Sequence, residues 1–288
     1  MATLSEWAAA TRPRTLPASI SPVAVGVGVA ASTGHVSVWR AVLALIVSLS
    51  IQVGANYAND YSDGVRGTDE RRSGPMRLVA SGRAAPNAVK AAAMAAFGLG
   101  AIAGLVLALS TSPWVLLVGA ACITAAWFYT GGRHPYGYAG FGEVFVFIFF
   151  GLVGVIGTAY VCTGKVLGLA MLASVPVGLL TVAILVVNNL RDIPTDAGVG
   201  KMTLAVRIGA PATRALYVAL VVVSFVFLGV IAPRRPASLL ALGALVVALR
   251  PVREVLSGVG GRELIPALGK TGRLELVFSA LLAVGLAL

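Results

Sequence analysis

Long apolar runs separated by glycine, proline and charged residues make up most of this chain. Nine runs approach the length of a membrane-spanning helix. They cover residues 16–33, 37–57, 87–109, 113–130, 141–162, 166–188, 212–232, 237–250 and 274–288. Uninterrupted runs of this kind favour helices over the alternating ten-residue strands of an outer-membrane barrel. We therefore predict an all-α, polytopic membrane protein of about nine transmembrane helices, forming a single domain over residues 1–288.

Two polar clusters interrupt this apolar pattern. One is Asn59-Asp60-Tyr61-Ser62-Asp63, continuing to Asp69-Glu70, and the other covers residues 188–196. Together they hold six of the eleven carboxylates of the chain. Each cluster follows directly on an apolar run, so these acids are grouped where a membrane helix meets water.

Composition supports the membrane assignment. The 288 residues are 58% hydrophobic and only 11% charged, with a mean hydropathy of +0.92. Such a chain is too apolar for a soluble protein. Cys122 and Cys162 lie within apolar runs and form no CxxC pair, so we expect them to pack as small hydrophobic residues.

The distribution of charge predicts an orientation. With the N-terminus in the cytoplasm, all but four of the 22 basic residues fall in cytoplasmic segments. The exceptions are Arg40, Lys165, Arg234 and Arg235. The positive-inside rule then places both polar clusters, and all eleven acids, on the cytoplasmic side of a bacterial plasma membrane. The net charge of +11 is accounted for by anionic lipid headgroups better than by nucleic acid. The first apolar run is expected to be retained, since no cleavable signal precedes it.

The two clusters share a spacing. Asn59 and Asp63 are four residues apart, as are Asn188 and Asp192. Residues i and i+4 lie on one face of a helix. Pro194 disfavours helical dihedral angles in the residue before it, so the sixth run is expected to end near Asp192 and to leave Asp196 on a turn or loop.

The residue types in the clusters indicate magnesium chemistry. Carboxylates and amide carbonyls are hard oxygen ligands, and the solitary His35 and His134 offer no zinc or iron site. Mg²⁺ held by few carboxylates keeps open positions that phosphate oxygens fill. Basic residues that could complete a diphosphate site are Arg66, Arg72, Arg77, Arg191 and Lys201.

Several motifs carry a resemblance to a known family. They are Arg12-Pro13-Arg14-Thr15-Leu16-Pro17, Asn59-Asp60-x2-Asp63 with Asp69, Gly74-Pro75-Met76-Arg77-Leu78-Val79, Tyr129-Thr130-Gly131-Gly132-x2-Pro135-x-Gly137-Tyr138, Asn188-x3-Asp192-x3-Asp196 and Gly200-Lys201-x-Thr203-Leu204. The chain resembles the UbiA superfamily of intramembrane prenyltransferases over most of its length. It is most similar to the branch that prenylates 1,4-dihydroxy-2-naphthoate in menaquinone biosynthesis.

The resemblance implies a fold and a set of roles. The fold is a ring of helices around a central cavity, capped by the two motif loops. The implied metal-binding residues are Asn59, Asp60, Asp63, Asp69, Asn188, Asp192 and Asp196, with Asp63, Asp192 and Lys201 as the catalytic set. In many relatives the last acid of the first motif stands four residues after the middle aspartate, where this chain has Gly67; Asp69 is six residues on. Arg12 matches a basic position in relatives and joins the predicted diphosphate contacts.

The resemblance also implies an activity. A polyprenyl group passes from polyprenyl diphosphate to 1,4-dihydroxy-2-naphthoate in a Mg²⁺-dependent reaction that releases pyrophosphate and CO₂. Residues of the fourth-to-fifth connection are predicted to contact the acceptor: Tyr129, Arg133, Tyr136, Tyr138 and Glu143. Two alternatives stay open, namely a superfamily enzyme with another acceptor and a cation-coupled transporter whose acids form its ion site.

Overall fold

The computed structural model describes residues 2–69, 74 and 76–288, and every regular element in them is helical. The elements of the first half are α1 (Leu4–Ala10), η1 (Pro13–Thr15), α2 (Pro17–Ala31), α3 (Val38–Arg66), α4 (Pro86–Ser110), α5 (Trp114–Phe128) and η2 (Tyr136–Ala139). Those of the second half are α6 (Gly142–Val146), η3 (Phe147–Val153), α7 (Gly154–Thr163), α8 (Gly168–Gly198), α9 (Leu204–Val226), α10 (Leu228–Ile231), η4 (Pro236–Ala244), α11 (Leu245–Leu256), η5 (Gly261–Leu264) and α12 (Ile265–Ala287). The predicted all-α class is confirmed.

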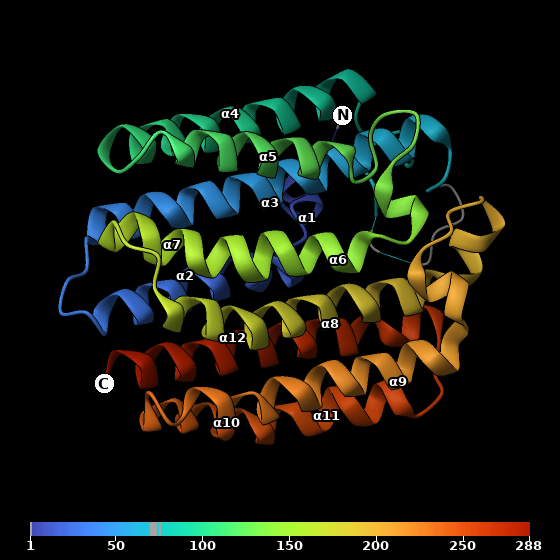
Figure 1. The fold of residues 1–288 in the computed structure, drawn as a ribbon. Helices are drawn as coiled ribbons and strands as arrows, with labels where there is room; N and C mark the ends of the chain where they lie inside the picture. Colours follow the sequence, from blue (N-terminus) through green and yellow to red (C-terminus); the bar gives the residue numbers. More distant parts are fainter. Residues whose placement is uncertain (1, 70–73, 75) are drawn as a thin grey trace.

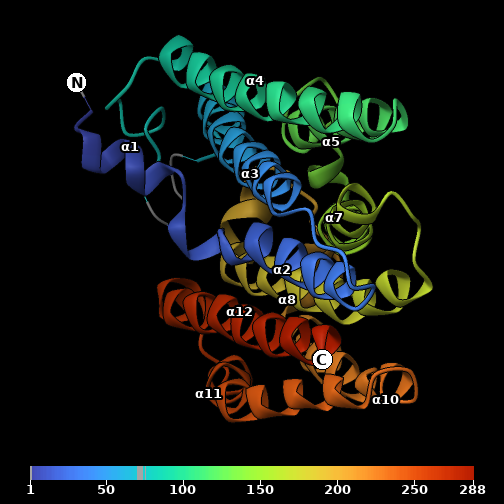
Figure 2. The same ribbon diagram turned by 90° about the vertical axis from the view of Figure 1, so that its left-hand side faces the viewer.

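The long helices run side by side as a bundle (Figure 1). In the view turned by 90°, α3, α4 and α5 lie together in the upper part, and α2, α8 and α12 lie together below them (Figure 2). Helix α3 packs on α4, α2 on α12, and α8 on α9. The largest buried apolar cluster belongs to the second part, where Val177, Leu180 and Phe278 lie in the interior.

Helix lengths support five of the nine predicted membrane spans. Five stretches in the described residues are long and apolar enough to cross a membrane, and α2 and α5 are shorter apolar helices. The five stretches are Val38–Arg66, Pro86–Ser110, Gly142–Thr163, Gly168–Gly198 and Leu204–Ile231. The predicted run 237–250 is not one regular α-helix, because η4 has 3₁₀ geometry before α11 begins. The count of nine spans stays a prediction.

Residues 59–63 and 188–196 lie inside helices, which corrects the sequence prediction, whereas Asp69 follows the end of α3. Helix α3 continues through the first cluster to Arg66, and α8 continues through Pro194 to Gly198. Asp196 therefore lies on a helix and not on a turn. A proline removes one backbone donor, yet the neighbouring turns keep theirs, and the Thr195 hydroxyl donates to the carbonyl of Asp192 at 2.9 Å.

One acid lies far from the others. The sequence places Glu275 near the start of the last span, but α12 begins at Ile265, so Glu275 lies well inside the helix and is fully buried. Its Oε1 lies 2.5 Å from the hydroxyl oxygen of Thr181 on α8. Glu275 therefore lies in the interior of the bundle and not at a helix end, and the side of the membrane to which the acids belong stays a prediction.

Candidate functional site

The segments that carry the predicted site residues meet at one end of the bundle. The carboxyl end of α3, the carboxyl end of α8 and the loop joining α5 to α6 all lie at the right-hand end in Figure 1. The α2–α3 connection lies at the opposite end. Two clusters that are far apart in sequence therefore face a common region.

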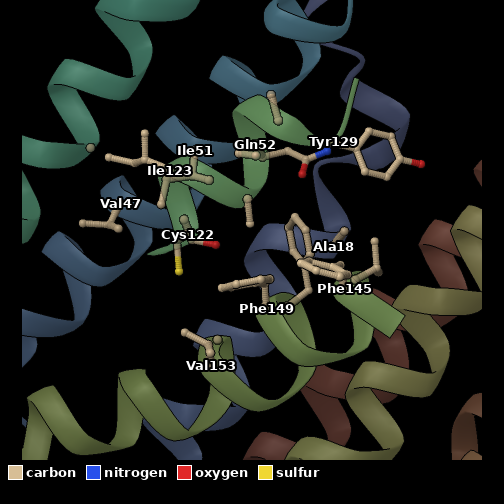
Figure 3. Close-up of a pocket in the computed structure, with 18 of the residues that line it drawn as sticks. Ala18, Val47, Ile51, Gln52, Cys122, Ile123, Tyr129, Phe145, Phe149 and Val153 are labelled. Atoms are coloured by element: carbon tan, nitrogen blue, oxygen red, sulfur yellow. The ribbon is translucent and has the colours of Figure 1, made fainter. Parts of the chain in front are cut away.

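A cavity of about 560 Å³ opens from this region into the bundle. Its polar end is lined by Arg12, Asn59, Asp63, Arg77, Asn188 and Lys201. Its body is apolar. Val47 and Ile51 of α3, Ile123 of α5, and Phe149 and Val153 of η3 point into it (Figure 3). Because η3 is a π-helical turn, an irregularity that often marks functional sites, its aromatic side chains differ in spacing from those of a regular helix.

One face of α3 forms a polar wall of the cavity. Asp63 and Asn59 continue inward to Asn56 and Gln52, at steps of three or four residues. The amide of Asn56 donates to the carbonyl of Thr11 at 2.8 Å, and that of Gln52 donates to the Thr15 hydroxyl at 3.3 Å. The sequence analysis missed Gln52 and Asn56, although helical spacing back from Asn59 would have identified them.

Asp63 is held from two sides. The Tyr138 hydroxyl donates to its Oδ1 at 2.7 Å, and Arg77 Nη2 lies 3.7 Å from its Oδ2. Burial, followed by the nearby Asp63 charge, raises the pKa of Tyr138 well above its ordinary value. The phenol therefore stays protonated and remains a donor to this carboxylate.

Asp60 has a different environment from Asp63. Its Oδ2 accepts from the backbone N–H of Leu78 at 2.8 Å, and its Oδ1 accepts from that of Val79 at 3.1 Å. It is buried and does not line the cavity. The Asp60 carboxylate thus anchors the backbone of Leu78 and Val79 to α3. A metal-binding role for Asp60 stays a prediction.

Asn59 and Arg77 contact neighbours of their own. Thr130 donates its hydroxyl to Asn59 Oδ1 at 2.8 Å, a contact that the sequence did not indicate. Arg77 Nε lies 3.0 Å from Asp69 Oδ2, which brings the predicted last acid of the first motif to the edge of the site. Within the described part of the chain, the buried Arg77 Nη1 has no hydrogen-bond partner.

The second cluster is organised by Arg191. Its guanidinium donates to both carboxylate oxygens of Asp192, at 2.7 and 2.6 Å, and to Asn188 Oδ1 at 2.8 Å. All of Arg191 is buried, and it does not line the cavity. Arg191 and Asp192 therefore form a buried pair that does not line the cavity, whereas Asn188, which Arg191 contacts, does line it.

Lys201 connects the second cluster to the first. Its Nζ lies 3.8 Å from Asp196 Oδ1 and 5.2 Å from the centre of the Tyr138 ring. Asp196 also accepts the backbone N–H of Lys201 at its own carbonyl, at 2.9 Å. The ammonium group is thereby held at the cavity from a segment that follows α8.

Arg66 and Arg72 are two further residues predicted to contact the diphosphate. Arg66 donates to the carbonyls of Thr130 and Gly132 and lies 5.5 Å from the Tyr138 ring centre, so it ties α3 to the α5–α6 loop. It does not line the cavity. Arg72 lies outside the described residues.

The residues predicted to contact the acceptor divide into two groups. Tyr129 and Tyr136 line the cavity, with ring centres 5.5 Å apart, and the Tyr136 hydroxyl donates to the carbonyl of Ala125 at 2.8 Å. Tyr138 and Glu143 lie behind the lining, where Glu143 accepts from the Asn189 amide at 2.9 Å. Arg133 is exposed on the loop.

The side chains at the polar end fit a hard cation that takes its remaining ligands from a bound anion. Among the described residues, no three Asp, Glu, His or Cys side chains come together as a complete metal site. The polar end of the cavity presents the Asp63 carboxylate with the amides of Asn59 and Asn188, beside Arg77 Nη1, which has no hydrogen-bond partner in the described part of the chain. A Mg²⁺ ion that takes several ligands from a phosphate needs only such a partial set.

Comparisons with known proteins identify the family of the chain. A model described as the UbiA prenyltransferase family matches residues 19–257. A relative from Mycobacterium tuberculosis, named 1,4-dihydroxy-2-naphthoate octaprenyltransferase, is 51% identical over 287 residues, covering 100% of this chain and 98% of the relative. The Escherichia coli protein of the same name is 37% identical over 229 residues, covering 77% and 74% respectively.

Solved structures share the fold. A UbiA homolog from Archaeoglobus fulgidus bound to GPP and Mg²⁺ gives a TM-score of 0.70 at 15% identity, covering 98% of this chain and 99% of that one. The apo structure of a UbiA homolog from Aeropyrum pernix K1 gives 0.72 at 18% identity, with 93% and 96% covered. At these identities the likeness concerns the fold alone.

Proposed function

Because the chain belongs to the UbiA prenyltransferase family, we propose that it transfers a polyprenyl group from polyprenyl diphosphate to 1,4-dihydroxy-2-naphthoate. The reaction releases pyrophosphate and CO₂ and gives the demethylmenaquinone skeleton. The observation that carries the proposal is the cavity, whose polar end presents Asp63, Asn188 and Arg77 and whose body is apolar. This polarity matches a donor with a charged diphosphate and a hydrocarbon tail.

The polar end would bind and activate the diphosphate. Among the described residues, the buried Arg77 Nη1 has no hydrogen-bond partner, and an anionic oxygen would satisfy it. Lys201 adds a second cation at the same cavity. Both charges favour departure of pyrophosphate, because negative charge accumulates on the bridging oxygen as the allylic C–O bond breaks.

Asp63, Asn59 and Asn188 are the residues that would hold Mg²⁺, with Asp192 and Asp196 as further predicted ligands. When bound, this ion supplies Lewis-acid stabilisation of the leaving diphosphate. Asp63 keeps its place in this set through the contacts of Tyr138 and Arg77.

The apolar body would protect the reacting carbon. Phe145, Phe149 and Tyr136 place aromatic rings along the cavity, and rings of this kind stabilise a nearby cation. Their surroundings exclude water, which would otherwise capture the allylic cation as an alcohol.

The acceptor would react from the aromatic side of the cavity. Tyr129 and Tyr136 offer ring faces to a naphthalene, and the electron-rich ring attacks the allylic carbon as its C–O bond breaks. The C–C bond to the carboxylate then breaks. Its electron pair stays in the ring, and CO₂ leaves, so charge and atoms balance.

A direct assay tests the proposal. Purified protein in detergent or lipid is supplied with Mg²⁺, a mixture of polyprenyl diphosphates, 1,4-dihydroxy-2-naphthoate and 4-hydroxybenzoate, and the products are identified by mass spectrometry. We expect a prenylated naphthoquinol that has lost the carboxylate. Preferential prenylation of 4-hydroxybenzoate would reassign the acceptor, and absence of pyrophosphate release would reject prenyl transfer.

The protein is a multi-pass membrane protein, and we infer from its basic residues that the polar end of the cavity faces the cytoplasm. Arg66, Arg77 and Lys201 lie at that end, whereas Arg40 lies at the other, where it donates to the carbonyls of Ser110 and Val161. A cytoplasmic opening would give the site access to soluble naphthoate and to magnesium.

A further inference from the structure

Tyr138 lies behind the cavity, not in its lining, and touches Asp63 directly. Its hydroxyl donates to Asp63 Oδ1 at 2.7 Å and lies 3.1 Å from the Thr68 hydroxyl oxygen. A carboxylate only accepts, and the phenol has a single hydrogen, so that hydrogen is committed to Asp63. Thr68 can then donate in turn to the phenol oxygen or to the carbonyl of Asp63, 3.2 Å away.

The Tyr138 ring is fixed by cations from both predicted motif regions. Arg66 of α3 lies 5.5 Å from the ring centre, and Lys201, after α8, lies 5.2 Å from it. The backbone N–H of Tyr138 donates to the carbonyl of Pro135 at 3.0 Å. The phenol is therefore held on a loop that α3 and the segment after α8 both secure.

This arrangement leaves the two oxygens of Asp63 in different surroundings. Oδ1 is turned back toward Tyr138, while Oδ2 lies 3.7 Å from the Arg77 guanidinium, which itself lines the cavity. A carboxylate tied at one oxygen cannot rotate without breaking that bond. Its second oxygen is thus presented in a fixed direction.

We propose that Tyr138 is a positioning residue, whose hydroxyl orients the Asp63 carboxylate so that its other oxygen serves the metal–diphosphate group. The inference rests on the proposed function, since it assumes that Asp63 holds the metal. It replaces the role in acceptor binding that the sequence suggested for Tyr138. Hydrogen-bond partners behind metal ligands commonly control metal affinity in this way.

The test compares two single-atom changes. Tyr138→Phe removes the hydroxyl that orients Asp63 but keeps the ring between its two cations. Tyr57→Phe is the matched control, because its hydroxyl donates to a backbone oxygen, the carbonyl of Trp7 at 3.1 Å, and Tyr57 does not line the cavity. Mn²⁺ binding to the detergent-solubilised protein is measured by electron paramagnetic resonance, with inorganic pyrophosphate present, and thermal unfolding is recorded for each variant.

We expect Tyr138→Phe to weaken Mn²⁺ binding roughly 10-fold, the lower end of the usual effect of such partners, with Tyr57→Phe within about twofold of wild type. In an Asp63→Asn background, Tyr138→Phe should cause no further loss, because it acts through Asp63. Unchanged binding in Tyr138→Phe, an equal loss in Tyr57→Phe, or full additivity with Asp63→Asn would overturn the inference.

The binding readout separates this inference from the proposed function. Wild-type protein that binds Mn²⁺ with pyrophosphate but does not prenylate the naphthoate would reject the activity and leave the role of Tyr138 intact. Wild-type protein that is active, with a Tyr138→Phe variant that binds Mn²⁺ normally, would reject the role of Tyr138 alone.

Discussion

At the scale of single residues, neighbouring acids of one motif have separate tasks. Asp60 and Asp63 are three positions apart on α3, yet Asp60 accepts two backbone N–H groups while Asp63 lines the cavity. The difference comes from what packs beside each carboxylate: the backbone of Leu78 and Val79 lies against Asp60, whereas Asp63 borders the cavity. Residue type alone does not distinguish a carboxylate that holds a neighbouring segment from one that lines a cavity.

This contrast predicts opposite effects of one substitution. Asp60→Asn places an amide N–H against the donors of Leu78 or Val79, so we expect a loss of about 1–3 kcal/mol in the free energy of unfolding. Asp63→Asn should leave the unfolding midpoint near that of wild type and reduce prenyl transfer on the order of 100-fold. Thermal unfolding and turnover, measured on the same preparations, check both. The reverse pattern would mean that the two roles are exchanged.

Arg12 offers another test at this scale. It has φ +56°, and no other non-glycine residue among those described has a positive φ. Asparagine tolerates this conformation without the charge. We expect Arg12→Asn to keep the unfolding midpoint and to raise KM for the diphosphate about tenfold, as loss of one charged hydrogen bond would. Arg14→Asn, at an exposed residue, is the control, and an equal rise there would assign the effect to general charge.

At the scale of elements, close approach of helices depends on small residues. A Cβ on Gly28 of α2 would lie 2.4 Å from the carbonyl oxygen of Ala283 on α12, whereas a Cβ on Gly98 of α4 meets nothing within 4 Å. Without a hydrophobic force between helices in lipid, such close contact is a main source of association. A larger residue at position 28 would therefore push α2 and α12 apart and reduce the packing between them.

We accordingly predict that Gly28→Ala lowers the free energy of unfolding by about 1–3 kcal/mol, the usual effect of overpacking. Gly98→Ala should be neutral or stabilising by about 0.5–1 kcal/mol, because alanine is the better helix former. Denaturation in mixed micelles gives both values. Equal effects of the two substitutions would show that this contact is not limiting.

At the scale of the whole molecule, the bundle brings together polar groups that the chain keeps more than a hundred residues apart. Asn59 and Asn188 reach one cavity because α3 and α8 end at the same end of the bundle (Figure 1). Tyr138 and Lys201 then join the two regions. The site is therefore a product of the complete fold.

The inferred orientation in the membrane can be measured at this scale. In a background with Cys122 and Cys162 replaced by alanine, Ala85→Cys and His35→Cys introduce single thiols at exposed positions at opposite ends of the bundle. A membrane-impermeant maleimide added to intact right-side-out vesicles should label residue 35 and not residue 85. Labelling of residue 85 alone would place the active end outside, contrary to the positive-inside rule.

The sequence alone determined the fold class and the approximate limits of several helices, and it predicted hard-cation chemistry for the two clusters. These follow from local information: apolar runs must form helices in lipid, and carboxylates with amides suit a hard cation. The family resemblance extended this to an activity. Helix ends were less accurate, since tertiary contacts carry α3 and α8 beyond their apolar stretches and through Pro194.

Only the tertiary structure decided which neighbour each polar group faces. In the structure, Asp60 accepts from the backbone of Leu78 and Val79, and Arg191 pairs with Asp192. Arg66 donates to the α5–α6 loop, and the buried Glu275 contacts Thr181. A side chain's partner depends on contacts between segments distant in sequence, which no local pattern records. The polar clusters thus predict the chemistry, and the packing of the helices decides which of their side chains face the cavity.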